Sequence, residues 1–214
     1  MRDHKRKMTA AVVCHAVLIV LELIALIGTA RFHGVRLFMY YTQDSNILGL
    51  AGSVCYLVTA ARRLKSGGEI PRWVRLLRYS SASCLALTFA VVVLLLAPLA
   101  PGGYRALLLE GNLLVLHFLG PVISCGSFLL LEDGPKLEPQ HIWAAFFPTA
   151  LYAAVAASMN AARRWHGPYF FLYVYEQPWW LSLLYLAVIC GAALALAWLL
   201  KAANGRIHRP ERDS

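Results

Sequence analysis

The chain has 214 residues, of which 59% are hydrophobic and 14% are charged, and its formal net charge is +9. This apolar share exceeds that of an ordinary soluble domain and indicates a membrane as the host. One membrane-spanning helix takes about 20 mainly apolar residues, so six spans would use more than half of the chain. We therefore expect a single transmembrane domain over residues 1–214 and exclude a second soluble domain.

Six apolar segments qualify as membrane-spanning helices, which predicts an all-α polytopic bundle. In chain order they are residues 8–30, 40–61, 79–99, 106–131, 141–159 and 179–200. The first follows a basic start, as in a cleaved signal peptide, but its apolar stretch exceeds the ~7–15 residues of such peptides. The second begins with the polar stretch 42–46, which needs a reason because polar groups that face lipid have no partners.

The basic residues predict the orientation of the bundle. If the amino terminus is cytoplasmic, fifteen of the 20 Lys and Arg lie in inner segments, including six between residues 62 and 78. The five in outer segments are Arg31, Arg36, Arg105, Arg163 and Arg164. This is the positive-inside pattern, and six spans return the carboxyl terminus to the cytoplasmic side. The charge thus predicts contact with anionic membrane lipids and no nucleic acid partner.

The connections differ in length and composition. Residues 98–103 and 132–136 are short turns rich in Gly and Pro, so the helices that they join should pack antiparallel. Residues 160–180 form a longer outer connection with eight Trp, Tyr and Phe residues. Because Trp and Tyr favour the boundary between water and lipid, we expect this segment to lie along the outer interface and to cover the bundle as a lid. No internal repeat is visible, which argues mildly against many transporter folds.

The cysteines and short motifs exclude several classes of site. Each of the five cysteines stands alone in an apolar segment, without a CxxC or Cys/His ligand spacing, so we expect no metal site and no disulfide framework. The GxSxG, HExxH, Walker A and GxGxxG patterns are absent, which leaves soluble hydrolases, zinc proteases and nucleotide-binding proteins without support. We expect no cofactor, although His15 and His117 keep open a haem held between helices.

Ionisable side chains within a span are costly and are therefore functional candidates. In this sequence they are His15, Glu22, Asp44, Glu110, His117 and His141. We interpret Glu22 as a structural hydrogen-bond partner. Asp44 either caps the polar start of the second helix or faces a cavity.

Two sets of polar residues have both a catalytic and a structural interpretation. Thr42, Ser45 and Asn46 share one helix face, as a nucleophile with supporting donors would, but such residues also hydrogen-bond helices to each other. His117 lies about 16 Å along a helix that starts near residue 106 and is either a general base or a buried structural histidine. Pro121, one turn later, frees a backbone carbonyl and favours a kink that opens a cavity.

The polar start of the second helix, residues 40–46, and the lone His117 in the fourth resemble the androgen-induced protein family and its bacterial six-helix relatives. The chain length and the six helices are also similar. Residues 168–174 resemble the family's aromatic Tyr-Pro-Phe-Leu-Asp element before the last helix, although Phe170 and Tyr173 stand where the family has proline and aspartate. The resemblance extends from Tyr40 to the end of the sixth helix.

This resemblance implies a transmembrane hydrolase that cleaves fatty acid esters of hydroxy fatty acids, and the bacterial relatives imply the inner membrane of a bacterial cell. The family's threonine nucleophile maps onto Thr42 and its histidine onto His117. A threonine hydroxyl attacks only if a base takes its proton, so His117 must reach Thr42. With a fourth helix that starts at residue 106, however, we expect His117 to lie several residues deeper than Thr42.

The expected chemistry is hydrolysis of a lipid ester, with no cofactor. Ser45 or Asn46 would donate to the developing oxyanion. Asp44, Glu110 and Asn112 would line the pocket or the path of the hydrolytic water. The alternative is a non-enzymatic multi-pass protein, either a small transporter or a lipid-binding or scaffold protein, in which the same residues line a solute path or join helices.

Overall fold

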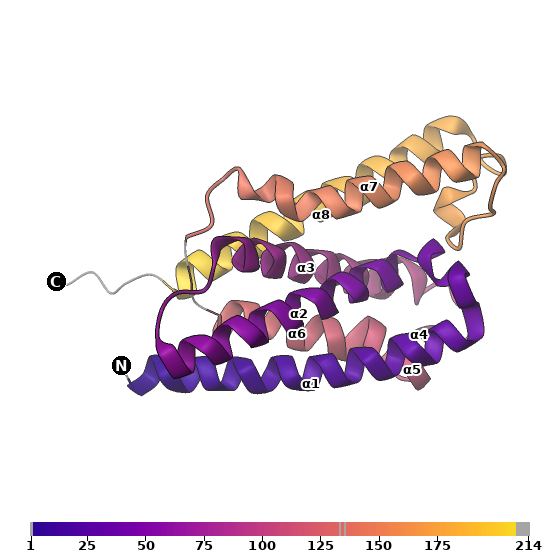
Figure 1. The fold of residues 1–214 in the computed structure, drawn as a ribbon. Coiled ribbons are helices and arrows are strands. Elements are labelled where there is room, and N and C mark those ends of the chain that lie inside the picture. The colour runs from indigo at the N-terminus through magenta and orange to yellow at the C-terminus, as the bar shows by residue number, and fades with distance from the viewer. Residues whose placement is uncertain (1, 133, 135, 209–214) are drawn as a thin grey trace.

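The computed structural model describes residues 2–132, 134 and 136–208. In this part of the chain there is no strand, and six helices are long and apolar enough to cross a membrane, which confirms the predicted all-α polytopic bundle. The first helix begins and the last helix ends at the same end of the bundle, as an even number of spans requires (Figure 1). We call this the inner end, because of its basic residues. Arg209 and Arg212 of the predicted basic tail lie outside the described residues.

The helices follow one another in an up-and-down order. Their bounds are α1 (Arg2–His33), η1 (Gly34–Met39), α2 (Tyr41–Ser66), α3 (Arg72–Val91), η2 (Val92–Leu96), α4 (Gly103–Leu108), α5 (Gly111–Leu113), η3 (Leu114–Leu119), α6 (Gly120–Leu130), α7 (His141–Ala161), η4 (Phe170–Leu172) and α8 (Trp179–Ile207). Two of the short elements, η2 and η3, are π-helical and continue a membrane span. The fourth span consists of α5, η3 and α6 in one run.

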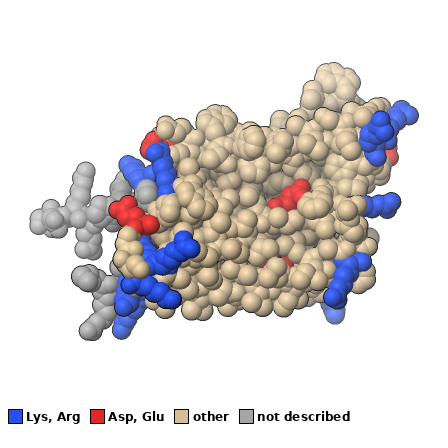
Figure 2. All heavy atoms as spheres, viewed as in Figure 1, with Lys and Arg blue, Asp and Glu red and all other residues tan. Residues whose placement is uncertain are grey.

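The outward-facing side chains of the helices are apolar, as lipid requires. More than half of the surface of each of the following is exposed: Val13, Val20, Ile24, Phe147, Leu183 and Val188. Lys and Arg gather at the two ends, and the band between is uncharged apart from acidic groups recessed in it (Figure 2). Lipid can surround this band because helices satisfy their backbone hydrogen bonds internally.

Helix α3 lies at the centre of the bundle and packs against α2, α6, α7 and α8. Small residues permit this close approach, as in many membrane helix pairs. Gly52 of α2 is one of them, because a Cβ atom at this position would lie 2.9 Å from Oγ of Ser81 in α3.

The third span begins earlier than predicted. It starts at Arg72 rather than at residue 79, so Arg75 and Arg78 belong to a helix and not to a cytoplasmic loop. Both side chains are buried, at 2% and 0% exposure. The prediction failed because charged residues next to an apolar run were interpreted as loop, although a buried partner can hold them inside the bundle.

The predicted fourth helix over residues 106–131 is wrong at its start. The chain leaves the helical conformation after Leu108, Gly111 takes a φ of +52°, and the membrane span begins at Gly111. Glycine adopts this backbone conformation without a Cβ penalty. Glu110 therefore lies outside the span, where its Oε1 is 3.3 Å from Nε of Arg105 and both side chains are exposed.

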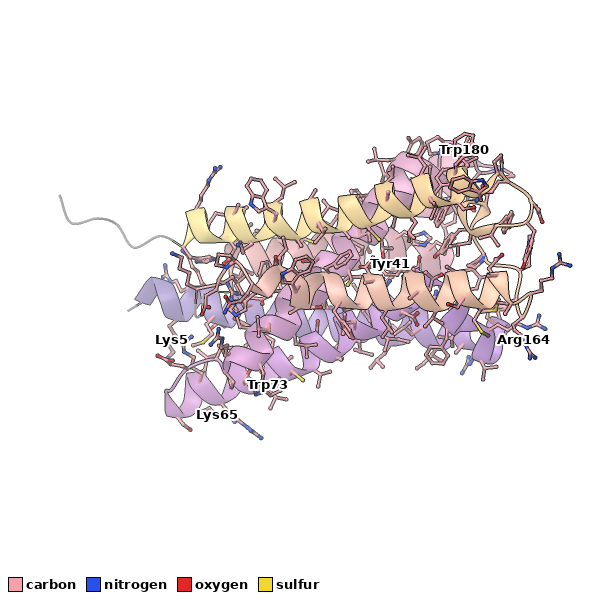
Figure 3. The ribbon with its side chains drawn as sticks, turned by 90° about the horizontal axis from the view of Figure 1, so that it is seen from above. Lys5, Tyr41, Lys65, Trp73, Arg164 and Trp180 are labelled. Carbon is pink, nitrogen blue, oxygen red and sulfur yellow. The ribbon has the colours of Figure 1, made fainter. Side chains whose placement is uncertain are left out.

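The aromatic connection between α7 and α8 lies at the outer end of the bundle, beside the ends of these two helices (Figure 1). Its residues Tyr169 and Phe171 are buried, with their rings stacked 5.0 Å apart. Arg164 and Trp180 mark this end in Figure 3, while Lys5 lies at the opposite end.

Candidate active site

Thr42 and His117 lie together at the outer end of the bundle. Thr42 is in the first turn of α2, and its Oγ1 is 3.3 Å from Nε2 of His117. The two side chains are 6% and 7% exposed. Because the fourth span begins at Gly111, His117 lies less than two turns from its start. The break before Gly111 thus removes the difference in depth that a helix from residue 106 would impose.

A backbone carbonyl determines which nitrogen of His117 carries the proton. Nδ1 lies 2.8 Å from the carbonyl oxygen of Leu107. A carbonyl only accepts, so Nδ1 holds the hydrogen and Nε2 presents its lone pair to the Thr42 hydroxyl. The Leu107 carbonyl orients the imidazole as the carboxylate does in a Ser-His-Asp triad. The break after α4 makes this contact because it folds Leu107 back over the start of the fourth span.

The helix that carries His117 is joined to α2 through Asn46. In the π-helical segment η3, backbone N–H groups donate to the carbonyl five residues earlier, as Gly120 does to Val115. Pro121 has no N–H, so the carbonyl of Leu116 loses its donor, as the sequence predicted for a carbonyl in this turn. Asn46 Nδ2 replaces that donor at 3.1 Å, and it also donates to the Thr42 carbonyl at 2.6 Å.

The predicted oxyanion donors on α2 are committed to other partners. Both amide hydrogens of Asn46 are used by carbonyls, so none is left for an oxyanion. The Ser45 hydroxyl donates to the Thr42 carbonyl at 3.0 Å and lies 2.8 Å from Oγ1 of Thr88. Ser45 and Asn46 therefore join helices, while the Thr42 hydroxyl faces the histidine.

Tyr169 places a phenol near Thr42, which the sequence analysis missed. The ring is buried, and the phenol lies close to the Thr42 side chain and to the first backbone N–H groups of α2, at Tyr41 and Thr42. Burial raises the pKa of Tyr169 to about 12, although these neighbouring groups oppose the shift, so the phenol keeps its proton at neutral pH. The signals in the sequence were its place in the aromatic connection and in the element at residues 168–174 that resembles the family's, but every ring there was interpreted as an interfacial anchor.

Two cavities meet at Thr42, which lines both together with Tyr169. The first has a volume of about 190 Å³ and lies between α2, α3, α7 and α8, with apolar walls that include Leu87, Val91, Val92, Ala153, Leu186 and Ile189. The second has a volume of about 560 Å³ and lies at the outer end, with walls that include Thr29, His33, Gln43, Asn112, His117 and Pro168. Since one water takes ~30 Å³, the second cavity has room for several.

The other residues predicted to line the pocket lie in different places. Asn112 lines the outer cavity, as predicted for the water path, but Glu110 lines none of the three cavities around the site. Asp44 and Ser45 line a third cavity of about 320 Å³ between α2 and α7, which does not include Thr42. Asp44 thus faces a cavity, although a different one from that of the Thr42 hydroxyl.

The other histidines lie elsewhere. His15 Nε2 bonds Glu132 at 3.0 Å, and His141 lies at the inner end of α7, 2.8 Å from an Arg72 nitrogen. His15 and His117 belong to separate polar clusters and each uses Nε2 for another partner, so the fold does not bring them together as haem ligands. Among the described residues, no group of three or more His, Cys, Asp or Glu is placed to hold a metal ion.

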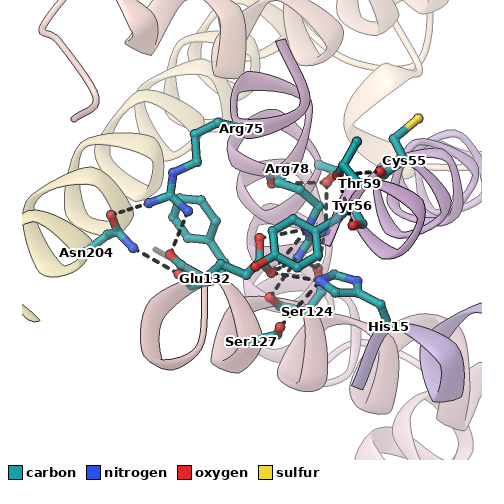
Figure 4. A network of polar contacts seen from close by, with 12 residues as sticks. His15, Cys55, Tyr56, Thr59, Arg75, Arg78, Ser124, Ser127, Glu132 and Asn204 are labelled. Atoms are coloured by element: carbon teal, nitrogen blue, oxygen red, sulfur yellow. Dashed lines mark hydrogen bonds and ion pairs between the residues drawn. The ribbon is translucent and has the colours of Figure 1, made fainter. Parts of the chain in front are cut away.

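A second polar cluster at the inner end was also missed. Arg78 and Glu132 are fully buried, with Nη2 of Arg78 2.9 Å from Oε1 of Glu132. Arg75 donates to the Glu132 carbonyl at 2.8 Å and to Asn204 Oδ1 at 2.6 Å. Together with His15 these groups join α1, α3 and α8 to the chain that follows α6 (Figure 4).

The Glu132 carboxylate in this cluster is compensated by the adjacent Arg78 guanidinium. Burial raises the pKa of Glu132, but the Arg78 charge and the hydrogen bond from His15 outweigh it and hold the pKa well below its usual range. The Glu132 carboxylate is therefore ionised, and the Arg78 guanidinium compensates its charge. None of the three cavities described above reaches the cluster, so we interpret it as a structural clamp.

Comparison with protein-family models, curated proteins and solved structures finds no match for this chain. The chemical capacity of the site therefore rests on its own geometry. A buried hydroxyl faces the unprotonated nitrogen of an oriented imidazole, with a phenol beside it and cavities on two sides. Such a group can carry out nucleophilic acyl transfer without a metal or cofactor.

Proposed function

We propose that the protein is an intramembrane lipid ester hydrolase in which Thr42 is the nucleophile and His117 the base. The observation that carries the proposal is the 3.3 Å contact between Thr42 Oγ1 and a His117 Nε2 whose tautomer is determined by the Leu107 carbonyl. The resemblance to the androgen-induced protein family and its bacterial relatives supports the same pair and a bacterial cell membrane as its location.

The reaction proceeds in two halves. Thr42 Oγ1 attacks the ester carbonyl carbon while His117 Nε2 takes its proton, and the Tyr169 phenol donates to the oxyanion. When this intermediate collapses, the bond to the alcohol oxygen breaks and Nε2 returns its proton to that oxygen. Water then attacks the acyl-threonine carbonyl carbon while Nε2 takes its proton. When this second intermediate collapses, the acyl bond to Thr42 Oγ1 breaks, Nε2 returns the proton to Oγ1, and the carboxylic acid leaves.

The cavities support an ester with long apolar arms. The acyl chain would occupy the apolar cavity between α2, α3, α7 and α8, which Thr42 lines. The outer cavity would receive the alcohol part and afterwards the hydrolytic water. A fatty acid ester of a hydroxy fatty acid meets this arrangement, because its carbonyl lies between two apolar arms.

A fluorophosphonate activity probe tests the proposal on the purified protein in detergent. Thr42 should be labelled, and Thr42→Ala and His117→Ala should abolish labelling and the hydrolysis of a long-chain p-nitrophenyl ester. Thr59→Ala is the matched control, because this hydroxyl on the same helix bonds only backbone carbonyls of α2.

The outcome separates an enzyme from a transporter or lipid-binding protein. If the unaltered chain binds lipid in its cavities but is neither labelled nor active, the non-enzymatic alternative replaces our proposal. Equal labelling of Thr42→Ala and the unaltered chain would show that another residue is the nucleophile.

A further inference from the structure

Glu22 is a buried acid in the middle of α1. It is 1% exposed, and neither carboxyl oxygen has a hydrogen-bond partner among the described residues. An ionised carboxylate without a partner is strongly disfavoured within a membrane span, so the group must be neutral. A neutral carboxyl carries a hydrogen, and a buried donor needs an acceptor.

Asn46 has the matching acceptor. Because its Nδ2 donates to the carbonyls of Thr42 and Leu116, the orientation of the amide is set and Oδ1 must find a donor of its own. Oδ1 is buried and has no partner among the described residues. An amide flip would place Oδ1 against two carbonyl oxygens, so a flip cannot give Oδ1 a donor.

Gly120 brings the two unpartnered groups together. Oε1 of Glu22 and Oδ1 of Asn46 lie 2.6 and 3.2 Å from the position that a Cβ atom on Gly120 would take. The missing side chain leaves the space in which the carboxyl from α1 and the amide from α2 meet, against the helix that carries His117. One hydrogen bond from the carboxyl to Oδ1 would satisfy a donor and an acceptor that otherwise remain buried and unpaired.

The geometry points to Glu22 as a positioning residue that holds its proton and donates it in a hydrogen bond to Asn46 Oδ1. This bond adds a restraint at the oxygen end of the amide whose Nδ2 ties the Thr42 carbonyl to the Leu116 carbonyl, and thereby limits changes in the separation of Thr42 from His117. Without the bond the amide rotates more freely, and the nucleophile and base spend less time within reach. The catalytic consequence rests on the hydrolase function proposed above, whereas the hydrogen bond does not.

Infrared difference spectroscopy tests the bond independently of activity. The spectrum of the unaltered protein minus that of Glu22→Gln at neutral pH should contain the C=O band of a protonated carboxyl, which shifts in D2O. Asn46→Leu should move this band to the frequency of a free carboxyl. A carboxylate band in its place, or no effect of Asn46→Leu, would overturn the inference.

Kinetics test the positioning role with a long-chain p-nitrophenyl ester as substrate. Glu22→Gln, whose amide can donate to the same Oδ1, should keep kcat within about threefold, whereas Glu22→Leu should lower kcat about tenfold with KM nearly unchanged. Equal loss in both variants would mean that the acid itself is required, and no loss in either would mean that the contact is dispensable; each result refutes the positioning role.

Separate control measurements test whether the variants fold and whether the unaltered protein hydrolyses esters. Melting temperatures in detergent show whether Glu22→Leu is folded, and if it is not, Glu22→Gln and the infrared spectra still decide. If the unaltered protein hydrolyses no ester, the proposed function fails while the infrared result continues to decide whether Glu22 bonds Asn46.

Discussion

Replacement of Tyr169 by phenylalanine removes one hydroxyl from the site and keeps the ring that lines both cavities. The phenol lies close to the Thr42 side chain, whereas the hydrogens of Ser45 and Asn46 already bond helix carbonyls. If the phenol stabilises the oxyanion, its loss should act on the transition state rather than on substrate binding.

The expected fall in kcat of Tyr169→Phe follows from the proposed role of the phenol as an oxyanion donor. Removal of one oxyanion donor costs about 3 kcal/mol, which corresponds to roughly a hundredfold lower kcat. The backbone N–H groups at the start of α2 remain, so activity should not vanish. KM should change little, because the stacking of the Tyr169 ring on Phe171 is retained. Loss of the buried phenol hydroxyl should lower stability by only about 1 kcal/mol.

Steady-state kinetics on a long-chain p-nitrophenyl ester provide the measurement, with the fraction of active protein determined by fluorophosphonate titration. Because the pKa of Tyr169 is raised to about 12 by burial, the ratio of the two rates should be constant from pH 6 to 9. An unchanged kcat in Tyr169→Phe, or a loss confined to KM, would refute the assignment of the phenol as an oxyanion donor.

Three further predictions concern stability and the surroundings of the site. Glu132→Gln leaves the buried Arg78 uncompensated and should lower stability by about 3–5 kcal/mol, seen as a lower melting temperature in detergent. Because the pKa of Glu132 is held far below its usual range, the contribution of this pair should be complete above about pH 5, near the pKa of an unfolded glutamate, and should fall progressively in stronger acid. Gly120→Ala forces a Cβ atom against the Glu22 carboxyl, so it should destabilise the bundle by about 1–3 kcal/mol and lower kcat, measured by melting and by ester hydrolysis. Glu110→Ala should leave kcat within about twofold, because this group is exposed and pairs with Arg105 at the surface; a large loss of activity would place it in the reaction path.

The span count was predictable because lipid allows only one solution for a long apolar segment, a helix that bonds its own backbone. The ends of the spans were less predictable. Arg75 and Arg78 resembled loop charges until Glu132 and Asn204, both distant in the sequence, became their buried partners. Hydropathy cannot foresee such pairs, since it scores each residue without its neighbours in space.

The candidate site was also predictable only in part. Thr42 and His117 were named from the sequence through a family resemblance, and the structure brings these two side chains together. In the structure the hydrogens of Ser45 and Asn46, which the sequence suggested as oxyanion donors, bond helix carbonyls. Tyr169 was overlooked because the aromatic connection contains many similar rings. Only the folded path of this segment shows which ring lies beside Thr42.

The sequence by itself determined that this protein is a six-helix membrane bundle with a polar start to its second span, because composition and charge act locally and need no knowledge of neighbours. Tertiary structure alone decided that Leu107 orients His117, that Asn46 donates to the Leu116 carbonyl left without a donor by Pro121, and that Glu22 and Asn46 both lie against Gly120. Each of these contacts joins elements that are apart in the chain, so it exists only once the helices have packed and buried polar groups must find partners.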